Sequence, residues 1–245
     1  MPTAPPTQAE LAEMMRVKRK FLRGRSLALT IPERMREFRR LQQRSLDILQ
    51  GNPAGYARFL RRNLAQRAIT PPPGVEIPER CGEIREVGDV VPDDACRALL
   101  RHRVPFVVIG ALAVNAHGHI RATEDSDVVF RRTPESEKAL LAALQELSAC
   151  WVMADKAEPG GVRLVPVTAS YVAHMNMMML MTDAGLLDLF DYIPGFPDEP
   201  VDSLFADCEL SNGVRYVSLR WLRKMKQAAG RPLDLTDLER LEGTP

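Results

Sequence analysis

The sequence predicts an α+β fold, in which a sheet flanked by helices follows a helical N-terminal extension. The chain before Pro71 consists of long segments with apolar residues at helical spacing, whereas the chain after it alternates short apolar runs with helical segments. Three consecutive prolines within Thr70–Gly74 separate the two parts and are typical of a linker. We therefore expect a basic helical extension at residues 1–70 and a sheet-containing domain at residues 71–245.

The charges of the chain are distributed unevenly. The 245 residues carry a formal net charge of +1, so the total charge says nothing about partners. Before Pro71, however, 15 Lys and Arg stand against 5 Asp and Glu. Two interpretations remain open: the basic residues form the solvated face of a packing module, or they form an arm that binds RNA or a protein partner.

The cysteines and the hydropathy pattern bear on where in the cell the protein is located. The four cysteines lie far apart, without the paired spacing of a zinc site or a disulfide framework, so we expect reduced thiols at Cys81, Cys96, Cys150 and Cys208. The N-terminus has no apolar signal core, and no segment is long enough to span a bilayer. We therefore expect a cytoplasmic protein that has no contact with membranes.

Three helices are predicted in the extension. Met1–Thr7 is rich in proline and is expected to be disordered. The helices follow at Gln8–Leu27, Thr30–Leu49 and Pro53–Ala68, where Pro32 and Pro53 suit a first helical turn. Their apolar residues recur at helical spacing and their arginines fall between them, which predicts one apolar and one basic face.

The domain opens with a strand, a helix and a second strand. Ile84–Val91 is a candidate strand, and the acidic pair that follows Pro92 predicts the start of a helix at Asp93–Arg103. An apolar run bounded by Gly110 then predicts a buried strand at Val104–Ile109.

The next stretch carries the candidate chemistry. Ala111–His117 is a predicted helix that stops at Gly118, and Asp125–Phe130 is a predicted strand. Alternate residues of a strand share a face, so Asp125 and Asp127 project to the same side. Adjacent carboxylates repel and need a cation between them, and Mg²⁺ prefers oxygen ligands and substrate phosphates. A glycine turn beside two such carboxylates suits a nucleoside triphosphate.

The rest of the domain continues the alternation. A helix is predicted at Thr133–Leu147. Two turns are predicted, at Gly160-Gly161 and at Asp183–Gly185. The other predicted elements are strands at Cys150–Ala154, Val162–Val167, Met175–Thr182, Leu186–Phe190 and Gly213–Val217 and helices at Leu219–Ala229 and Asp234–Leu241. The methionines of Met175–Thr182 lack interleaved His or Cys, so they predict adaptable packing rather than copper binding. His117 and His119 lack zinc-type spacing and are interpreted as turn residues.

The segment Val104–Phe130 resembles the nucleotidyltransferase superfamily, in particular its minimal toxin-type, AbiEii-like and antibiotic-modifying members. The resemblance rests on an apolar strand, the Gly110-Ala111 turn, and the Asp125-Ser126-Asp127 pair preceded by Arg121 and Thr123. It implies a mixed-sheet nucleotidyltransferase-type fold. It also implies that Asp125 and Asp127 are catalytic metal ligands and that the turn, Arg121 and Thr123 contact the nucleotide.

The resemblance extends to Leu241 and implies two further site residues. Asp188 is a lone acid in an apolar strand and matches the third carboxylate of the family, with Asp191 as the alternative on the opposite face. The run Lys226–Asp237 is similar to the Lys…Gly-Arg-Pro…Asp…Asp ending of these enzymes, which implies that Lys226 faces the triphosphate. The alternatives are that Lys226 is a solvated surface residue, or that the acids and arginine of this run form an ion-pair network that packs the last helix.

The family likeness implies a Mg²⁺-dependent or Mn²⁺-dependent enzyme. It would transfer a nucleoside monophosphate from a nucleoside triphosphate to a hydroxyl of tRNA, protein or a small molecule, as a component of a toxin–antitoxin pair. RNA or a cognate antitoxin would bind the basic N-terminal helices. The alternative is a non-catalytic nucleotidyltransferase-fold protein that binds RNA or another partner, which the departures from the family pattern at Ala111 and Ser126 favour.

Overall fold

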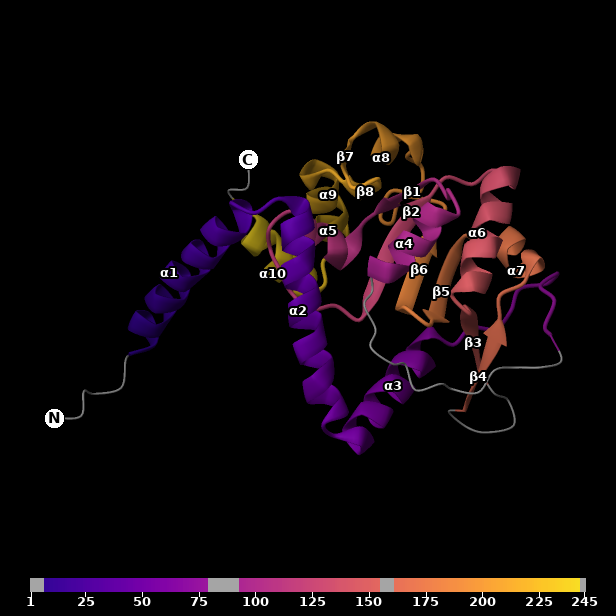
Figure 1. The fold of residues 1–245 in the computed structure, drawn as a ribbon, viewed down its shortest axis with the longest axis horizontal. Coiled ribbons are helices and arrows are strands. Elements are labelled where there is room, and N and C mark those ends of the chain that lie inside the picture. The colour runs from indigo at the N-terminus through magenta and orange to yellow at the C-terminus, as the bar shows by residue number, and fades with distance from the viewer. Residues whose placement is uncertain (1–6, 79–92, 155–160, 243–245) are drawn as a thin grey trace.

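The computed structural model describes residues 7–78, 93–154 and 161–242, in which ten helices surround a mixed sheet of eight strands (Figure 1). The strands are β1 (Phe106–Val108), β2 (Asp125–Phe130), β3 (Cys150–Ala154), β4 (Val162–Pro166), β5 (Met177–Thr182), β6 (Gly185–Phe190), β7 (Cys208–Ser211) and β8 (Val214–Val217). Their order in the sheet is β4-β3-β5-β6-β2-β1-β8-β7. The combination of a mixed sheet with flanking helices agrees with the predicted α+β class.

The helices lie at both ends of the chain and between the strands. They are α1 (Gln8–Leu27), α2 (Ile31–Gln50), α3 (Pro53–Arg67), α4 (Asp93–Arg101), α5 (Gly110–Ala116), α6 (Pro134–Glu146), α7 (Ala169–His174), α8 (Asp202–Ala206), α9 (Leu219–Ala229) and α10 (Pro232–Leu241). Several start at the predicted signals: the Thr30 and Thr133 side chains form capping boxes, and Ser218 accepts a hydrogen bond from the first turn of α9.

Strand β2 lies in the middle of the sheet and fixes which side chains share a face. It pairs antiparallel with β1 and parallel with β6, and in the β2–β6 register Asp127 lies beside Asp188 and Asp125 beside Leu186. Paired residues project to the same face of a sheet. Asp125, Asp127 and Asp188 therefore lie on one face, and the neighbouring residues Ser126 and Leu187 lie on the other.

The face opposite the acids is buried in the largest hydrophobic cluster. Val128 and Leu187 lie in this cluster, which α4, α6 and α7 cover (Figure 1). The helices contribute Ala95, Cys96, Ala98, Leu99, Leu140, Ala143, Leu144, Tyr171 and Val172. Ser126 of β2 lies on this face and is fully buried.

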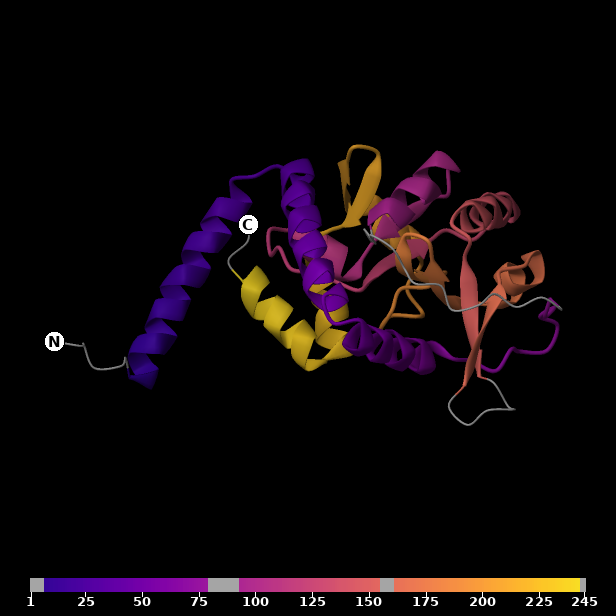
Figure 2. The ribbon, with the colours of Figure 1, turned by 60° about the horizontal axis from the view of Figure 1, so that its bottom comes forward.

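The face that carries the acids is covered in two separate parts. At one end α3 packs Leu64 against a small cluster from β3, β4 and β5, with Leu186 at its edge (Figure 2). At the other end Val129 and Phe190 join the cluster formed with α5, α8 and α9. Since Asp188 lies between Leu186 and Phe190 on β6, the acids occupy the interval between two packed regions.

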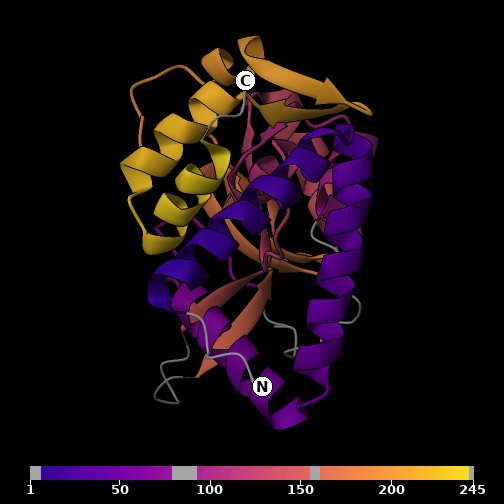
Figure 3. The ribbon, with the colours of Figure 1, turned by 90° about the vertical axis from the view of Figure 1, so that its left-hand side faces the viewer.

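The N-terminal extension contributes to the core unequally. Phe38 of α2 is fully buried in the largest cluster. Leu64 of α3 is almost fully buried in the small cluster with β3, β4 and β5. Helix α1 has a single buried residue, Ser26, and Figures 1 and 3 show it on the outside of the molecule. The segment after α3 follows the sheet closely, because the backbone amide of Ile69 donates to the carbonyl of Val152 at 2.9 Å. The division into domains at residue 70 stays a prediction.

The sequence predicted most elements within a few residues, including the full bounds of α1, β2, β3 and α9. It missed α7, α8 and β7, because a helix of five or six residues is too short to repeat its apolar spacing and β7 is largely exposed. Three predictions lie wholly or partly outside the described residues: the strand at Ile84–Val91, the disorder at Met1–Thr7 and the turn at Gly160-Gly161. Thr7 itself is described and forms the N-terminal cap of α1, so the prediction of disorder is wrong at that residue.

Two further expectations can be compared with the structure. Cys96 and Cys208 are free thiols, as expected, and the thiol of Cys150 donates to the carbonyl of Ser148. Cys81 lies outside the described residues. In the parts of the chain that the structure describes, no helix is long and apolar enough to cross a membrane.

The burial of Phe38 predicts that α2 is part of the folding unit of the sheet. Truncating a fully buried Phe removes its contacts and leaves a cavity, so we expect Phe38→Ala to lower the free energy of unfolding by about 3–5 kcal/mol in urea titrations. Ile48→Ala on the same helix is the control, since Ile48 is 78% exposed and should be nearly neutral. An unchanged urea midpoint for Phe38→Ala would show that α2 folds independently of the sheet.

Candidate metal centre

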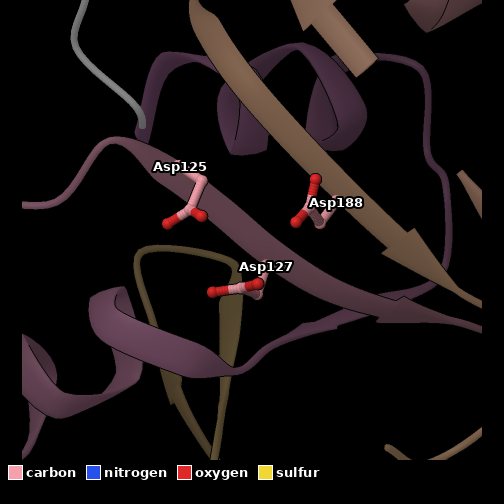
Figure 4. Close-up of side chains that lie close together, drawn as sticks. All are labelled: Asp125, Asp127 and Asp188. Carbon is pink, nitrogen blue, oxygen red and sulfur yellow. The ribbon is translucent and has the colours of Figure 1, made fainter. Parts of the chain in front are cut away.

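The three predicted acids converge. Asp125 and Asp127 of β2 and Asp188 of β6 each offer a carboxylate oxygen, and these oxygens all lie within 4.8 Å of one another. Figure 4 shows the side chains turned toward a common space. The β2–β6 register causes this convergence, because it places Asp127 directly beside Asp188 on the same face. The predicted meeting of these three residues is confirmed.

Glycine at position 110 is required by the approach of Asp127. Gly110 starts α5 with a φ of 59°, and a Cβ atom added there would lie 1.8 Å from Oδ2 of Asp127. The backbone amide of Ile109 also donates to the carbonyl of Asp127 at 2.9 Å. The Gly110-Ala111 turn therefore lies against the acids as its place in the sequence motif predicts, and its contact with a nucleotide stays a prediction.

The acids are costly to ionise together. Burial raises the pKa of Asp188 to about 6, although the guanidinium of Arg67 opposes this change. Burial, with the negative charges of Asp125 and Asp188, raises the pKa of Asp127 to about 8. A divalent cation would remove this penalty, and three carboxylates are the oxygen donor set that Mg²⁺ and Mn²⁺ accept. The residues present therefore fit a hard divalent metal ion.

Arg67 already binds two of the three acids. It is the last residue of α3, is 9% exposed, and donates through both terminal nitrogens to Asp188, with an Nη2–Oδ2 distance of 3.3 Å. The same Nη2 lies 3.4 Å from Oδ2 of Asp125. Sequence reasoning assigned the arginines of α3 to a basic face and missed this one. The available signal was its position three residues after Leu64, on the apolar stripe of the helix.

Thr123 holds the first acid of the pair. Its hydroxyl donates to Oδ1 of Asp125 at 2.9 Å, and its backbone amide donates to Oε1 of Gln42 at 3.2 Å. Thr123 thus contacts a candidate metal ligand and orients its carboxylate. A direct contact with nucleotide stays a prediction.

Arg121 and Lys226 meet at a buried carboxylate. Asp237 is fully buried and accepts from Arg121 at 2.9 Å through each oxygen, and Nζ of Lys226 lies 2.8 Å from Asp237. Lys226, 5% exposed, also donates to Asp234 at 2.8 Å. Arg231 lies 2.7 Å from Asp234, so the arginine and acids of this run take part in an ion-pair network, as the alternative interpretation expected. Arg121 and Lys226 extend this network. The network joins α9 and α10 to the segment before β2. The interpretation of Lys226 as a solvated surface residue is wrong, because this side chain is buried. The predicted roles of both cations toward nucleotide stay untested.

The other candidate ligands lie elsewhere. Asp191, the alternative third acid, accepts from Arg132 at 2.7 Å. His117 bonds through Nε2 to the carbonyl of Val217 at 2.7 Å, and His119 lies 3.9 Å from Asp237. These residues are engaged in packing contacts and not in the three-acid cluster.

Comparison of the chain with protein-family models gives no match, and a search of curated proteins gives no similar sequence. The residues of this site and their geometry are therefore the basis for assigning a function.

The contact between Gly110 and Asp127 predicts the effect of one added methyl group. Gly110→Ala should displace Asp127, and the left-handed backbone costs about 1–2 kcal/mol with a side chain present. We expect a lower melting temperature and loss of stabilisation by Mg²⁺ in thermal melts. Gly24→Ala in α1 meets no atom within 4 Å and should change neither quantity adversely. An intact Mg²⁺ response in Gly110→Ala would refute the steric argument.

The raised pKa of Asp127 predicts how stability depends on pH. Its folded pKa of about 8 exceeds the unfolded value of about 3.9, so ionisation destabilises the metal-free fold progressively as the pH rises from about 4 to 8. Asp127→Asn removes this cost. In metal-free buffer the variant should melt above the wild type at pH 8, by roughly 2–4 °C per kcal/mol recovered, and the difference should vanish toward pH 4.

The control for this comparison is the exposed Asp198→Asn, which should show no pH-dependent difference. If Asp127→Asn melted below the wild type at pH 8 without metal, repulsion among the acids would not be the dominant effect at this position.

Proposed function

We propose that this protein is a Mg²⁺-dependent or Mn²⁺-dependent nucleotidyltransferase that transfers a nucleoside monophosphate from a nucleoside triphosphate to a hydroxyl acceptor. The observation that carries the proposal is the convergence of Asp125, Asp127 and Asp188 from two adjacent strands, with Gly110 packed against them. The likeness to the nucleotidyltransferase superfamily in motif order and spacing supports the same assignment, and with it a nucleotidyltransferase-type sheet.

The three aspartates would hold the metal, which supplies charge stabilisation at the transferred phosphate and activates the attacking hydroxyl. Thr123 keeps Asp125 oriented through its hydrogen bond. Asp127 must lose its proton for the metal to bind, so binding should strengthen as the pH rises toward 8. Gly110 leaves room for the Asp127 carboxylate at the base of the site.

The buried ion-pair network around Asp237 would hold the segment that leads into β2, and with it Asp125 and Asp127, in position. Asp237 binds Arg121, and Arg121 exchanges hydrogen bonds with Asn115 of α5 at 2.8 and 3.0 Å. This network fixes the segment that leads into β2. For triphosphate contact, Arg231 is a more accessible cation than Lys226, because its side chain is 76% exposed. The hydrogen bond to Asp234 raises the pKa of Arg231, and the negative charges of Asp127 and Asp125 raise it further.

RNA is the acceptor that the surface charge favours. A cavity of about 1000 Å³ lies between α1, α2 and α10, and eight of its eighteen lining residues are Lys or Arg, against three Glu. The basic residues include Arg16, Arg19, Lys20, Arg23, Arg40 and Arg44. Clustered Lys and Arg attract a phosphate backbone and release counterions on binding. A role in a toxin–antitoxin pair, with a cognate antitoxin on the same helices, belongs to this proposal.

A second function has one specific observation in its favour. Arg67 binds Asp188 and Asp125 with the charge that a metal would otherwise provide. A non-catalytic protein of this fold could keep its acids paired in this way and use the basic helices to bind RNA or a partner. Ala111, at the position where the family pattern has a phosphate-contacting residue, agrees with this alternative.

One experiment separates the two functions. The purified protein is incubated with each α-labelled nucleoside triphosphate, Mg²⁺ and total tRNA, and transfer of label is measured. We expect transfer by the wild type and a loss of about 10²-fold or more for Asp125→Asn and Asp188→Asn, because each removes charge that holds the metal. Asp198→Asn, at an exposed position outside the three-acid cluster, should retain activity.

The same proteins are melted with and without Mg²⁺ and triphosphate. If the wild type transfers no label from any triphosphate and Mg²⁺ leaves its melting temperature unchanged, the enzyme proposal is abandoned and the non-catalytic function stands.

A further inference from the structure

We infer that Arg67 is a built-in counter-cation of the three-aspartate site, that Mg²⁺ must displace it, and that the N-terminal extension thereby controls metal binding. This inference rests on the proposed function and adds its regulation. It concerns a residue outside the motif that resembles nucleotidyltransferases.

The contacts of Arg67 compete with those of a metal. Its guanidinium takes both carboxylate oxygens of Asp188 and approaches Oδ2 of Asp125. Mg²⁺ binds carboxylate oxygens at about 2.1 Å in a strict octahedral geometry. A metal at the centre of the three acids would have to share these oxygens with Arg67 and would face a positive charge at close range. Arg67 therefore has to leave at least Asp188 before the metal binds.

The backbone couples this exchange to α3. Arg67 is the last residue of the helix, so its side chain is anchored to the helix end. One turn earlier, Nδ2 of Asn63 donates to Oε2 of Glu124 at 2.5 Å, which ties α3 to the residue just before Asp125. Helix α3 thus holds the site at two points, and a movement of α3 would change both.

The packing around α3 leaves room for such a movement. Its hydrophobic contact with the sheet is a small cluster built around Leu64. Beside it, a cavity of about 240 Å³ lies between α2, α3, residues 122–124 and the start of β6, and is lined by Tyr56, Phe59, Leu60, Met181 and Leu186. This cavity opens to solvent. Helix α3 buries one apolar side chain, Leu64, whereas α6 on the opposite face buries Leu140, Ala143 and Leu144, so α3 is held less tightly than that helix.

Two other roles of Arg67 predict different behaviour. A purely structural ion pair would stabilise the fold and leave the intrinsic metal affinity unchanged once the protein is folded. A phosphate-binding residue would change the affinity for triphosphate and leave the affinity for Mg²⁺ alone the same. Competition for the carboxylates is the one role that raises Mg²⁺ affinity when the guanidinium is removed.

The test is calorimetric titration of the full chain with Mg²⁺ alone, at pH 8. The variant Arg67→Met keeps the apolar stem and removes the charge, Arg67→Lys keeps the charge without the planar fork, and Arg61→Met is the control on the same helix. Arg61 is exposed, so its loss matches the change in net charge without touching the acids. A charge-assisted hydrogen bond typically contributes enough for about a tenfold change in an equilibrium constant.

We expect Mg²⁺ to bind Arg67→Met about tenfold more tightly than the wild type, Arg67→Lys to lie between them, and Arg61→Met to match the wild type. Without metal, Arg67→Met should melt below the wild type, and added Mg²⁺ should raise its melting temperature to that of the wild type. Arg67→Lys keeps the comparison decisive if Arg67→Met does not fold.

The outcomes separate this inference from the proposed function. Equal or weaker Mg²⁺ binding by the Arg67 variants would overturn the inference, while the proposed function would stand because Mg²⁺ still binds the wild type. If neither the wild type nor any folded Arg67 variant binds Mg²⁺, the proposed function itself fails. Asp188→Asn should abolish binding in every background if the measured site is the three-acid cluster.

Discussion

Electrostatic repulsion among three aspartates on neighbouring strands is the constraint around which this molecule is organised. The β2–β6 register forces Asp127 and Asp188 together on a face that is otherwise apolar. Burial and mutual repulsion raise the pKa of Asp127 and Asp188, which means that the fold tolerates these acids at a cost. Positive charge is needed to offset this cost, and either Arg67 or a divalent metal ion can supply it.

Positive charge reaches this region from two distant parts of the chain. Arg67 arrives from the end of α3, and the network in which Lys226 and Arg121 bind Asp237 joins α9 and α10 to the segment before β2. The first contacts the carboxylates directly, whereas the second fixes the segment that carries them. Because Arg67 is the cation that binds the acids directly, a metal ion can replace it while the network around Asp237 stays intact.

Local patterns predicted the parts of the site that are local. The alternation of Asp125 and Asp127, the glycine at 110 and the lone acid at 188 were sufficient to expect a three-acid cluster, and the structure brings these acids together. The same patterns failed for Arg67, since its partners lie 58 and 121 residues away and helical spacing does not specify long-range partners. The placement of Arg121 and Lys226 on Asp237 depended in the same way on tertiary packing.

The parallel pairing of β2 with β6 has a consequence for how the site is assembled. Side chains alternate along a strand, so a slip of one residue in this pairing would turn Asp188 to the buried side and bring Leu187 or Leu189 beside Asp127. Such a slip would leave Asp125 and Asp127 together on their face of β2 and would remove the third carboxylate from the site. Because the long crossover between the two strands must close before Asp188 meets Asp127, capture of a metal ion by all three acids would report that the native topology has been reached.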